Sequence, residues 1–149
     1  MLEIKKILFP VDVYAAPTKL IDFVSGMARR FGAELHILYV VRAFEAAYET
    51  DYIPLSQYEA SLAELKTALN TKLNDLVTHH FADYPQVKAV LASGHTAREI
   101  LKYIKENNIE LVIMGTHGHQ GLEKVLFGSV AQRVVETSPA PVVTFNPNA

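Results

Sequence analysis

The residues best placed to do chemistry in this chain lie in a glycine-spaced segment, 115–130. Four of the chain's seven glycines fall in it: Gly115, Gly118, Gly121 and Gly128. Glycine lets the backbone take positive φ or approach a ligand closely, so neighbouring N–H groups can converge on an anion. Residues 111–114 before it have the apolar character of a buried strand, and residues 129–132 suit the first turn of a helix. A strand-to-helix turn of this type is a common phosphate site in α/β proteins.

Ser129 has two possible roles at the end of this segment. Its hydroxyl can bond a phosphate oxygen, or it can cap the helix, with Gln132 completing a capping box. Two better-known phosphate motifs are excluded. A P-loop needs a lysine where Gly128 stands, and the dinucleotide fingerprint needs Gly-x-Gly where the chain has Gly115-x-x-Gly118. On spacing alone, a phosphate turn and an ordinary glycine-rich turn both stay open.

Two histidines in the segment, His117 and His119, raise the question of catalysis. A histidine beside a terminal phosphate could act as an acid, a base or a charge partner, although a pair in a loop is more often solvated. Ser129, His117 and Asp12 are the residue types of a hydrolase triad, but the chain has no Gly-x-Ser-x-Gly elbow. We therefore assign no catalytic residue and no metal site. The other histidines suggest no ligand either: His36, His79, His80 and His95.

The composition describes one domain, residues 1–149, of which half are hydrophobic. A chain of this length buries roughly two thirds of its unfolded surface. The net charge of −2 argues against duplex nucleic acid as a partner. Cysteine is absent, which excludes disulfides and thiolate metal sites. Because we find no signal-peptide pattern and no apolar run near the ~20 residues that span a bilayer, we expect a cytoplasmic protein without a membrane segment.

Strands and helices are expected to alternate along the chain. Strands are predicted over residues 4–11, 34–41, 87–92, 109–114 and 142–145. Helices are predicted from about Pro17 to a C-cap at Gly32, from Ser56, from Thr96 to about 107, and over 129–136. Five strands joined by helical crossovers predict an α/β fold: a single-domain, doubly wound, five-stranded parallel sheet with helices on both faces.

The helix that begins at Ser56 carries the clearest start signal. Ser56-x-x-Glu59 is a capping box, and Thr96-x-x-Glu99 is a second one for the following helix. An apolar stripe runs down the longer helix and is expected to pack into the core: Leu62, Leu65, Leu69, Leu73, Leu76 and Val77. The stretch before it, 43–55, is either a surface connection anchored by its aromatic residues or a loop that folds over the site or onto a partner.

Four landmarks resemble the universal stress protein family, in the branch whose members bind ATP. The spacing Gly115-x2-Gly118-x9-Gly128-Ser129 is similar to the nucleotide-binding signature of the family. Residues 7–12 resemble its first strand, residues 90–100 its third-strand-to-helix turn, and residues 129–143 its C-terminal end. The resemblance implies the strand order 3-2-1-4-5. That order brings Asp12 and Gly115 together at the carboxyl ends of strands 1 and 4, where ligands bind in such sheets.

The resemblance also implies a part of the nucleotide for each site residue. The positions that enclose adenine match Pro10, Val11, Asp12 and the end of the second strand, Val40 or Val41. The positions beside the ribose match Met114 and Gly115. The positions of the turn around the phosphates match His117, Gly118, Gly128, Ser129 and Val130. Asp12 would repel a phosphate, although Mg²⁺ or Mn²⁺ could bridge the two; spacing alone also allows Asp12 a purely capping role.

The chain departs from the family after Asp12, where small residues and a serine are usual. Tyr14 stands there and could crowd or shield the phosphates, and Thr18 could restore a hydroxyl one turn later. The resemblance implies an ATP-binding regulator of the stress response that acts on an unknown regulatory protein, with at most slow hydrolysis or autophosphorylation. It also implies a homodimer through the last strand: Val142, Val143, Thr144 and Phe145. The competing hypothesis is a nucleotide-free dimeric interaction module on the same fold.

Overall fold

Five parallel strands form one sheet in the computed structural model, which describes residues 2–42, 54–117 and 127–146. The strands are β1 (Lys6–Pro10), β2 (Glu34–Val41), β3 (Val87–Ser93), β4 (Leu111–Gly115) and β5 (Val142–Phe145). Their order is β3-β2-β1-β4-β5, and every neighbouring pair is parallel. The predicted fold class and the order 3-2-1-4-5 are confirmed.

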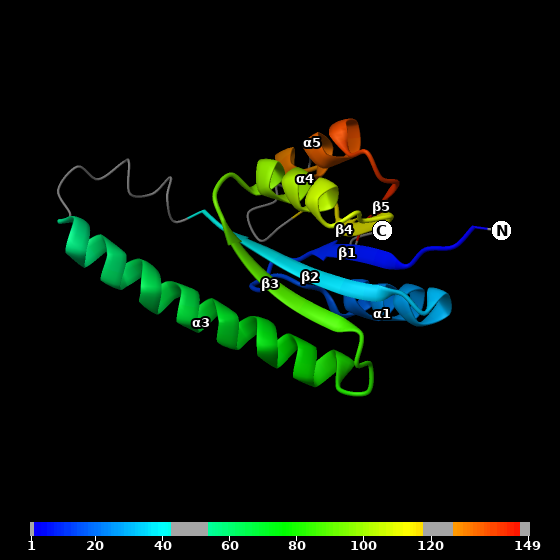
Figure 1. The fold of residues 1–149 in the computed structure, drawn as a ribbon, viewed down its shortest axis with the longest axis horizontal. Coiled ribbons are helices and arrows are strands. Elements are labelled where there is room, and N and C mark those ends of the chain that lie inside the picture. The colour runs from blue at the N-terminus through cyan, green and yellow to red at the C-terminus, as the bar shows by residue number, and fades with distance from the viewer. Residues whose placement is uncertain (1, 43–53, 118–126, 147–149) are drawn as a thin grey trace.

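Within the described residues, four helices cover the two faces of this sheet (Figure 1). They are α1 (Thr18–Phe31), α3 (Leu55–Phe81), α4 (Thr96–Glu106) and α5 (Ser129–Thr137). Helices α1 and α3 lie on one face, and α4 and α5 lie on the other. Within the described residues, no helix is long and apolar enough to cross a membrane.

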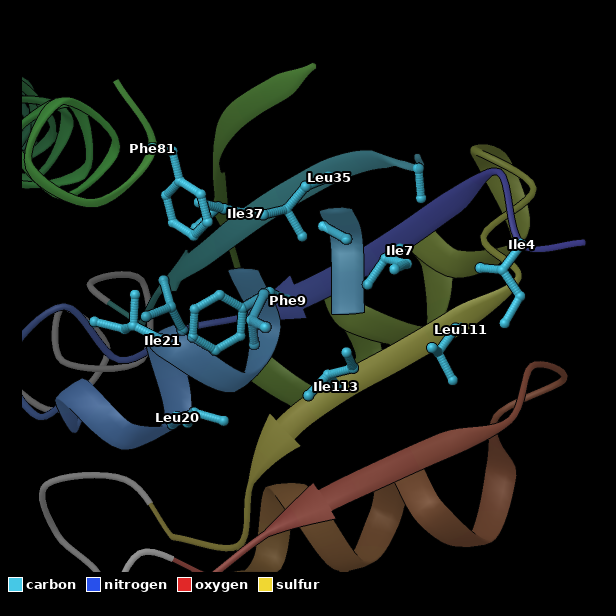
Figure 2. Close-up of a cluster of buried hydrophobic side chains, with 14 of the residues drawn as sticks. Ile4, Ile7, Phe9, Leu20, Ile21, Leu35, Ile37, Phe81, Leu111 and Ile113 are labelled. Carbon is cyan, nitrogen blue, oxygen red and sulfur yellow. The ribbon is translucent and has the colours of Figure 1, made fainter. Parts of the chain in front are cut away.

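The core has two parts because both faces of the central strands are covered. Toward α1 and α3, Figure 2 shows Phe9 and Ile37 of the sheet among Ile21 and Phe81 of the helices. Toward α4 and α5, the next residue along β1, Leu8, packs into a second apolar cluster. Side chains alternate along each strand, so the continuous apolar run in β1 is buried on both sides.

Helix α3 differs from its prediction in how it starts and in what it buries. It begins at Leu55 after Pro54, which makes no side-chain cap, so the capping box from Ser56 to Glu59 is wrong because both residues lie inside the helix. Its buried residues are Leu69, Leu73 and Phe81. The expected core stripe is therefore wrong for its first turns: Leu65 is 36% exposed, because this half of α3 extends past the end of the sheet (Figure 1).

The predicted first residues of two further helices, Thr96 and Ser129, are confirmed, but each cap lies one residue earlier than predicted. His95 caps α4 by accepting a hydrogen bond from the amide of Arg98 at 3.4 Å, so Thr96 is the first helical residue and not a cap. Gly128 occupies the cap position of α5, and Ser129 is likewise the first helical residue. The capping role for Ser129 is thus excluded. The C-cap at Gly32 is confirmed, with φ of 62°.

Candidate functional site

A pocket opens at the carboxyl ends of β1 and β4, where the strand order reverses. Its volume is about 470 Å³, and its walls come from the ends of β1, β2 and β4 and the starts of α4 and α5. The predicted site residues that line it are Pro10, Val11, Asp12, Val40, Met114, Gly115, His117, Gly128, Ser129 and Val130. Val41 is not part of the lining, and Gly118 lies outside the described residues.

Asp12 shapes the turn that follows β1. Its Oδ1 accepts a hydrogen bond from the amide of Tyr14 at 2.9 Å, and its carbonyl accepts one from the amide of Ala15 at 3.1 Å. The strand-end capping role that spacing allowed is therefore present in the structure. Because Asp12 also lines the pocket, its carboxylate can order the turn and still face a ligand.

Tyr14 points toward α3 and does not line the pocket. Its ring meets Tyr39 edge-on, with centroids 6.4 Å apart, and Lys72 Nζ lies 4.9 Å from the ring centroid. The small residues Ala15 and Ala16 line the pocket instead. The expectation that Tyr14 crowds or shields the phosphate side is therefore not met. Thr18, the first residue of α1, does not line the pocket either.

Tyr39 lines the pocket near Asp12 and contributes a neutral hydroxyl group to it. Burial raises the pKa of Tyr39 to about 12, and the negative charge of Asp12 and the neighbouring Tyr14 add to the effect. The phenol therefore keeps its proton at neutral pH. It can donate a hydrogen bond but carries no charge there.

The turn after β4 is closed by backbone hydrogen bonds around Thr116. The amide of Thr116 donates to the carbonyl of Phe145 at 3.0 Å, and the amide of Gly128 donates to the carbonyl of Thr116 at 2.8 Å. A Cβ on Gly128 would lie 3.2 Å from that carbonyl oxygen. This contact is tighter than most Cβ contacts, so the close approach of the two backbone segments favours glycine at 128.

His117 presents an unpaired ring nitrogen at this turn. Its Nδ1 lies 3.0 Å from Oγ1 of Thr116, which is itself 5% exposed. Its Nε2 is buried and has no hydrogen-bond partner among the described residues. When the Thr116 hydroxyl donates to Nδ1, Nε2 carries the proton and can donate to an acceptor.

The start of α5 supplies further donors to the same end of the pocket. The amide of Gly128 is already bonded to Thr116, so it is not free for an anion. The next amides, of Ser129, Val130 and Ala131, belong to the first turn, where amides have no acceptor inside the helix. All three residues line the pocket. A helix N-terminus with open amides attracts negative charge.

Among the described residues, one acidic and one basic side chain line the pocket. Arg42 follows the end of β2, and Asp12 follows β1. Since β1 separates β2 from β4 and Arg42 lies beyond the end of β2, the backbone at Arg42 is more than about 10 Å, two interstrand spacings, from the turn at Gly115. The groups of three or more acidic, histidine or cysteine residues that could hold a metal are absent from the described parts of the chain.

Sequence reasoning missed several lining residues. The end of β2 contributes Leu38, Tyr39 and Arg42, and the start of α4 contributes Thr96. Thr116 could have been found, because it stands between the two assigned positions Gly115 and His117. Thr96 carried no such signal, since only the packing of α4 beside β2 brings it to the pocket.

The fold and the pocket define a doubly wound α/β protein with a pocket at its switch point. Comparison with protein families matches residues 3–146 to the universal stress protein family, so the chain belongs to that family. The universal stress protein YxiE of Bacillus subtilis is 29% identical over 144 residues, which span 93% of this chain and 96% of YxiE.

Solved structures agree on the fold. Universal stress protein UspA from Lactobacillus plantarum superposes with a TM-score of 0.71 at 25% identity, over 97% of this chain and 99% of that one. A universal stress protein in complex with cAMP superposes with a TM-score of 0.69 at 14% identity, over 97% of this chain and 98% of that one. The second likeness, at its low identity, shows a shared fold.

Proposed function

We propose that the chain binds ATP in the switch-point pocket and acts as a nucleotide-dependent regulator in the stress response. The observation that carries the proposal is the pairing of two donor groups at one end of the pocket. The buried, unpaired Nε2 of His117 lies at the same turn as the open first-turn amides of α5. Both are suited to phosphate oxygens.

The rest of the pocket suits a purine. Pro10, Val11, Val40 and Met114 form apolar walls between the phosphate end and Arg42. A volume of about 470 Å³ falls in the usual range for small-molecule sites, about 300–1,000 Å³. The relative solved with cAMP holds a ligand with the same adenine base, which supports adenine here.

A divalent metal, Mg²⁺ or Mn²⁺, would be held mainly by the nucleotide. Asp12 is the one carboxylate among the described residues that line the pocket, and it already accepts a hydrogen bond from Tyr14. Magnesium often binds through one or two carboxylates, phosphates and water. The donor set therefore fits a metal that arrives with ATP, with Asp12 as its protein ligand.

Turnover would be slow at most. His117 Nδ1 contacts the hydroxyl of Thr116, a neutral group, so none of the described carboxylates orients the ring as in a Ser-His-Asp triad. His117 is better suited to bind a phosphate than to activate water. Slow hydrolysis or autophosphorylation stays a secondary possibility, and a change of shape or partner on ATP binding is the main proposed output.

We further propose a homodimer through β5, whose residues are Val142, Val143, Thr144 and Phe145. β5 is an edge strand, and its four residues are half-buried. Beside it, the ring of Phe23 packs on Phe145 with centroids 5.8 Å apart, and Phe23 remains 36% exposed. A second copy would cover this apolar edge and pair its open backbone groups. We place this dimer in the cytoplasm, where its unknown regulatory partner would meet it.

The first experiment is to denature the purified protein, identify any released nucleotide by mass spectrometry, and titrate the protein with ATP, ADP and AMP. Released ATP, or micromolar ATP binding, would support the proposal. If no nucleotide is released and none binds, the second hypothesis takes its place: a dimeric interaction module in which the glycine-spaced segment is a rigid turn.

A further inference from the structure

The backbone of Thr116 is fixed on both sides, and this places its side chain. The amide of Thr116 donates to the carbonyl of Phe145 on β5, and its carbonyl accepts from the amide of Gly128 at the start of α5. Thr116 is 5% exposed, and its branched Cβ restricts rotation of the side chain. Its hydroxyl is therefore held close to one position between β4 and α5.

This hydroxyl has a single hydrogen-bond partner among the described residues, Nδ1 of His117 at 3.0 Å. In a neutral imidazole, one ring nitrogen carries a proton and the other accepts. If Nδ1 carried the proton, the hydroxyl would have to accept, and its own buried proton would have no acceptor among the described groups. A buried donor without an acceptor is costly. The favoured arrangement is thus a hydroxyl that donates to Nδ1 and a proton on Nε2 of His117.

The protonated edge of the His117 ring lies beside the start of α5. A Cβ on Gly128 would be 4.0 Å from Cδ2, the ring carbon bonded to Nε2. Nε2 itself is buried and has no hydrogen-bond partner among the described residues, and His117 lines the pocket. An Nε2–H group in this position can donate to an anion. The opposite tautomer would turn a lone pair toward the anion and repel it.

We propose that Thr116 is a positioning residue for nucleotide binding, whose hydroxyl holds the His117 ring as an Nε2–H donor to a phosphate oxygen. The inference rests on the proposed function, because the acceptor is a phosphate of the nucleotide in the switch-point pocket. Thr116 acts through His117. Residues that act through one contact have non-additive effects, so the contribution of Thr116 to affinity requires the imidazole.

The first test measures ATP affinity by calorimetry at pH 8. Thr116→Val keeps the shape of the side chain and both backbone hydrogen bonds but lacks the hydroxyl, so we expect ATP to bind about two- to tenfold more weakly. Thr116→Ser restores the hydroxyl and should recover most of the affinity. Thr67→Val is the matched control, because it removes a hydroxyl that bonds the carbonyl of Ala63 within α3, outside the pocket lining.

A double-mutant cycle separates positioning from a general structural role. His117→Leu should weaken ATP binding about 10- to 100-fold, because it removes a charge-assisted hydrogen bond. In that background, Thr116→Val should cause no further loss. Additive losses, or an unchanged affinity in Thr116→Val alone, would overturn the inference and leave the proposed function intact. A wild type that binds none of ATP, ADP and AMP would overturn both.

Nitrogen NMR of the His117 ring provides a readout in the free protein that needs no nucleotide. The wild type and Thr116→Ser should carry the proton on Nε2 at pH 8, and added ATP should shift the Nε2 resonance. A proton on Nδ1 in the free wild type would contradict the inference. This measurement decides the matter even if Thr116→Val folds poorly.

Discussion

The carbonyl of Thr116 accepts a hydrogen bond from the amide of Gly128 at 2.8 Å, and this hydrogen bond closes the turn between β4 and α5. It links the start and the end of the glycine-spaced segment and positions both His117 and the first turn of α5. The donors proposed to bind phosphate therefore depend on how closely two backbone segments approach. A Cβ at position 128 would lie 3.2 Å from the Thr116 carbonyl oxygen, so this turn would have to shift to accept a side chain there.

Gly128→Val should abolish detectable ATP binding while the sheet stays folded. The new Cβ would lie 3.2 Å from the Thr116 carbonyl, so the turn must open and the α5 amides must move. Losing one or two charge-assisted hydrogen bonds lowers affinity by about 10- to 1,000-fold. Gly26→Val is the matched control, because a Cβ at exposed Gly26 meets nothing within 4 Å. Calorimetric titration with unchanged affinity in Gly128→Val would place the site elsewhere.

Arg42→Met should weaken ATP, ADP and AMP by the same factor, about tenfold. The reason is its position on the β2 side, where its backbone is more than about 10 Å from the phosphate turn. Titrations with the three nucleotides measure this directly. A loss that grows with the number of phosphates would instead place the phosphates beside Arg42 and reverse the proposed orientation of the ligand.

Val143→Lys should yield monomers in light scattering, because a charge would enter the apolar edge at β5. The matched control is Ala89→Lys on β3, the opposite edge of the sheet, which should leave the assembly unchanged. Circular dichroism must show that both variants are folded. A dimer that survives Val143→Lys but not Ala89→Lys would move the interface to β3.

Tyr84→Phe should lower the free energy of unfolding by about 1 kcal/mol. The Tyr84 hydroxyl lies 3.1 Å from the carbonyl of Ala28 and also bonds the carbonyl of Ala33, which fastens the turn between α1 and β2. Phenylalanine keeps the ring under the Arg29 guanidinium, 5.2 Å from its centroid, so the variant isolates the hydroxyl. Thermal unfolding should shift down by about 2–4 °C. An unchanged midpoint would show that water replaces the hydroxyl without cost.

The strand pattern could be predicted from the sequence because apolar runs bounded by turns are a local signal. The bounds of β2 and β5 agree with the prediction. Helix caps were harder, since they depend on which residue takes an extended backbone. His95 and Gly128 do so one position before the predicted caps Thr96 and Ser129. The stripe on α3 showed an apolar face but could not show where the sheet beneath it ends.

From the sequence, we could predict only those parts of the candidate site that follow from motif spacing and from the order of the strands. The glycine spacing located the β4 turn, and the end of β1 followed from the strand order. Choosing between Val40 and Val41 required knowing which face of the sheet each side chain of β2 points to, because neighbouring side chains point to opposite faces. The contact between His36 and Tyr103 could not be predicted from the sequence, because only the packing of α4 against β2 brings Tyr103 to His36.

The pairing of β1 with β4 has a consequence for the order of events during synthesis. Leu8 lies beside Val112, so the first strand emerges from the ribosome long before its partner exists. Domains rich in such distant contacts tend to fold slowly, because a long loop must close first. The pocket also needs the start of α5, which is made later still. If the proposed function holds, ATP can bind only after nearly the whole chain has been made. Its binding would then stabilise the folded domain and would not guide the early steps of folding.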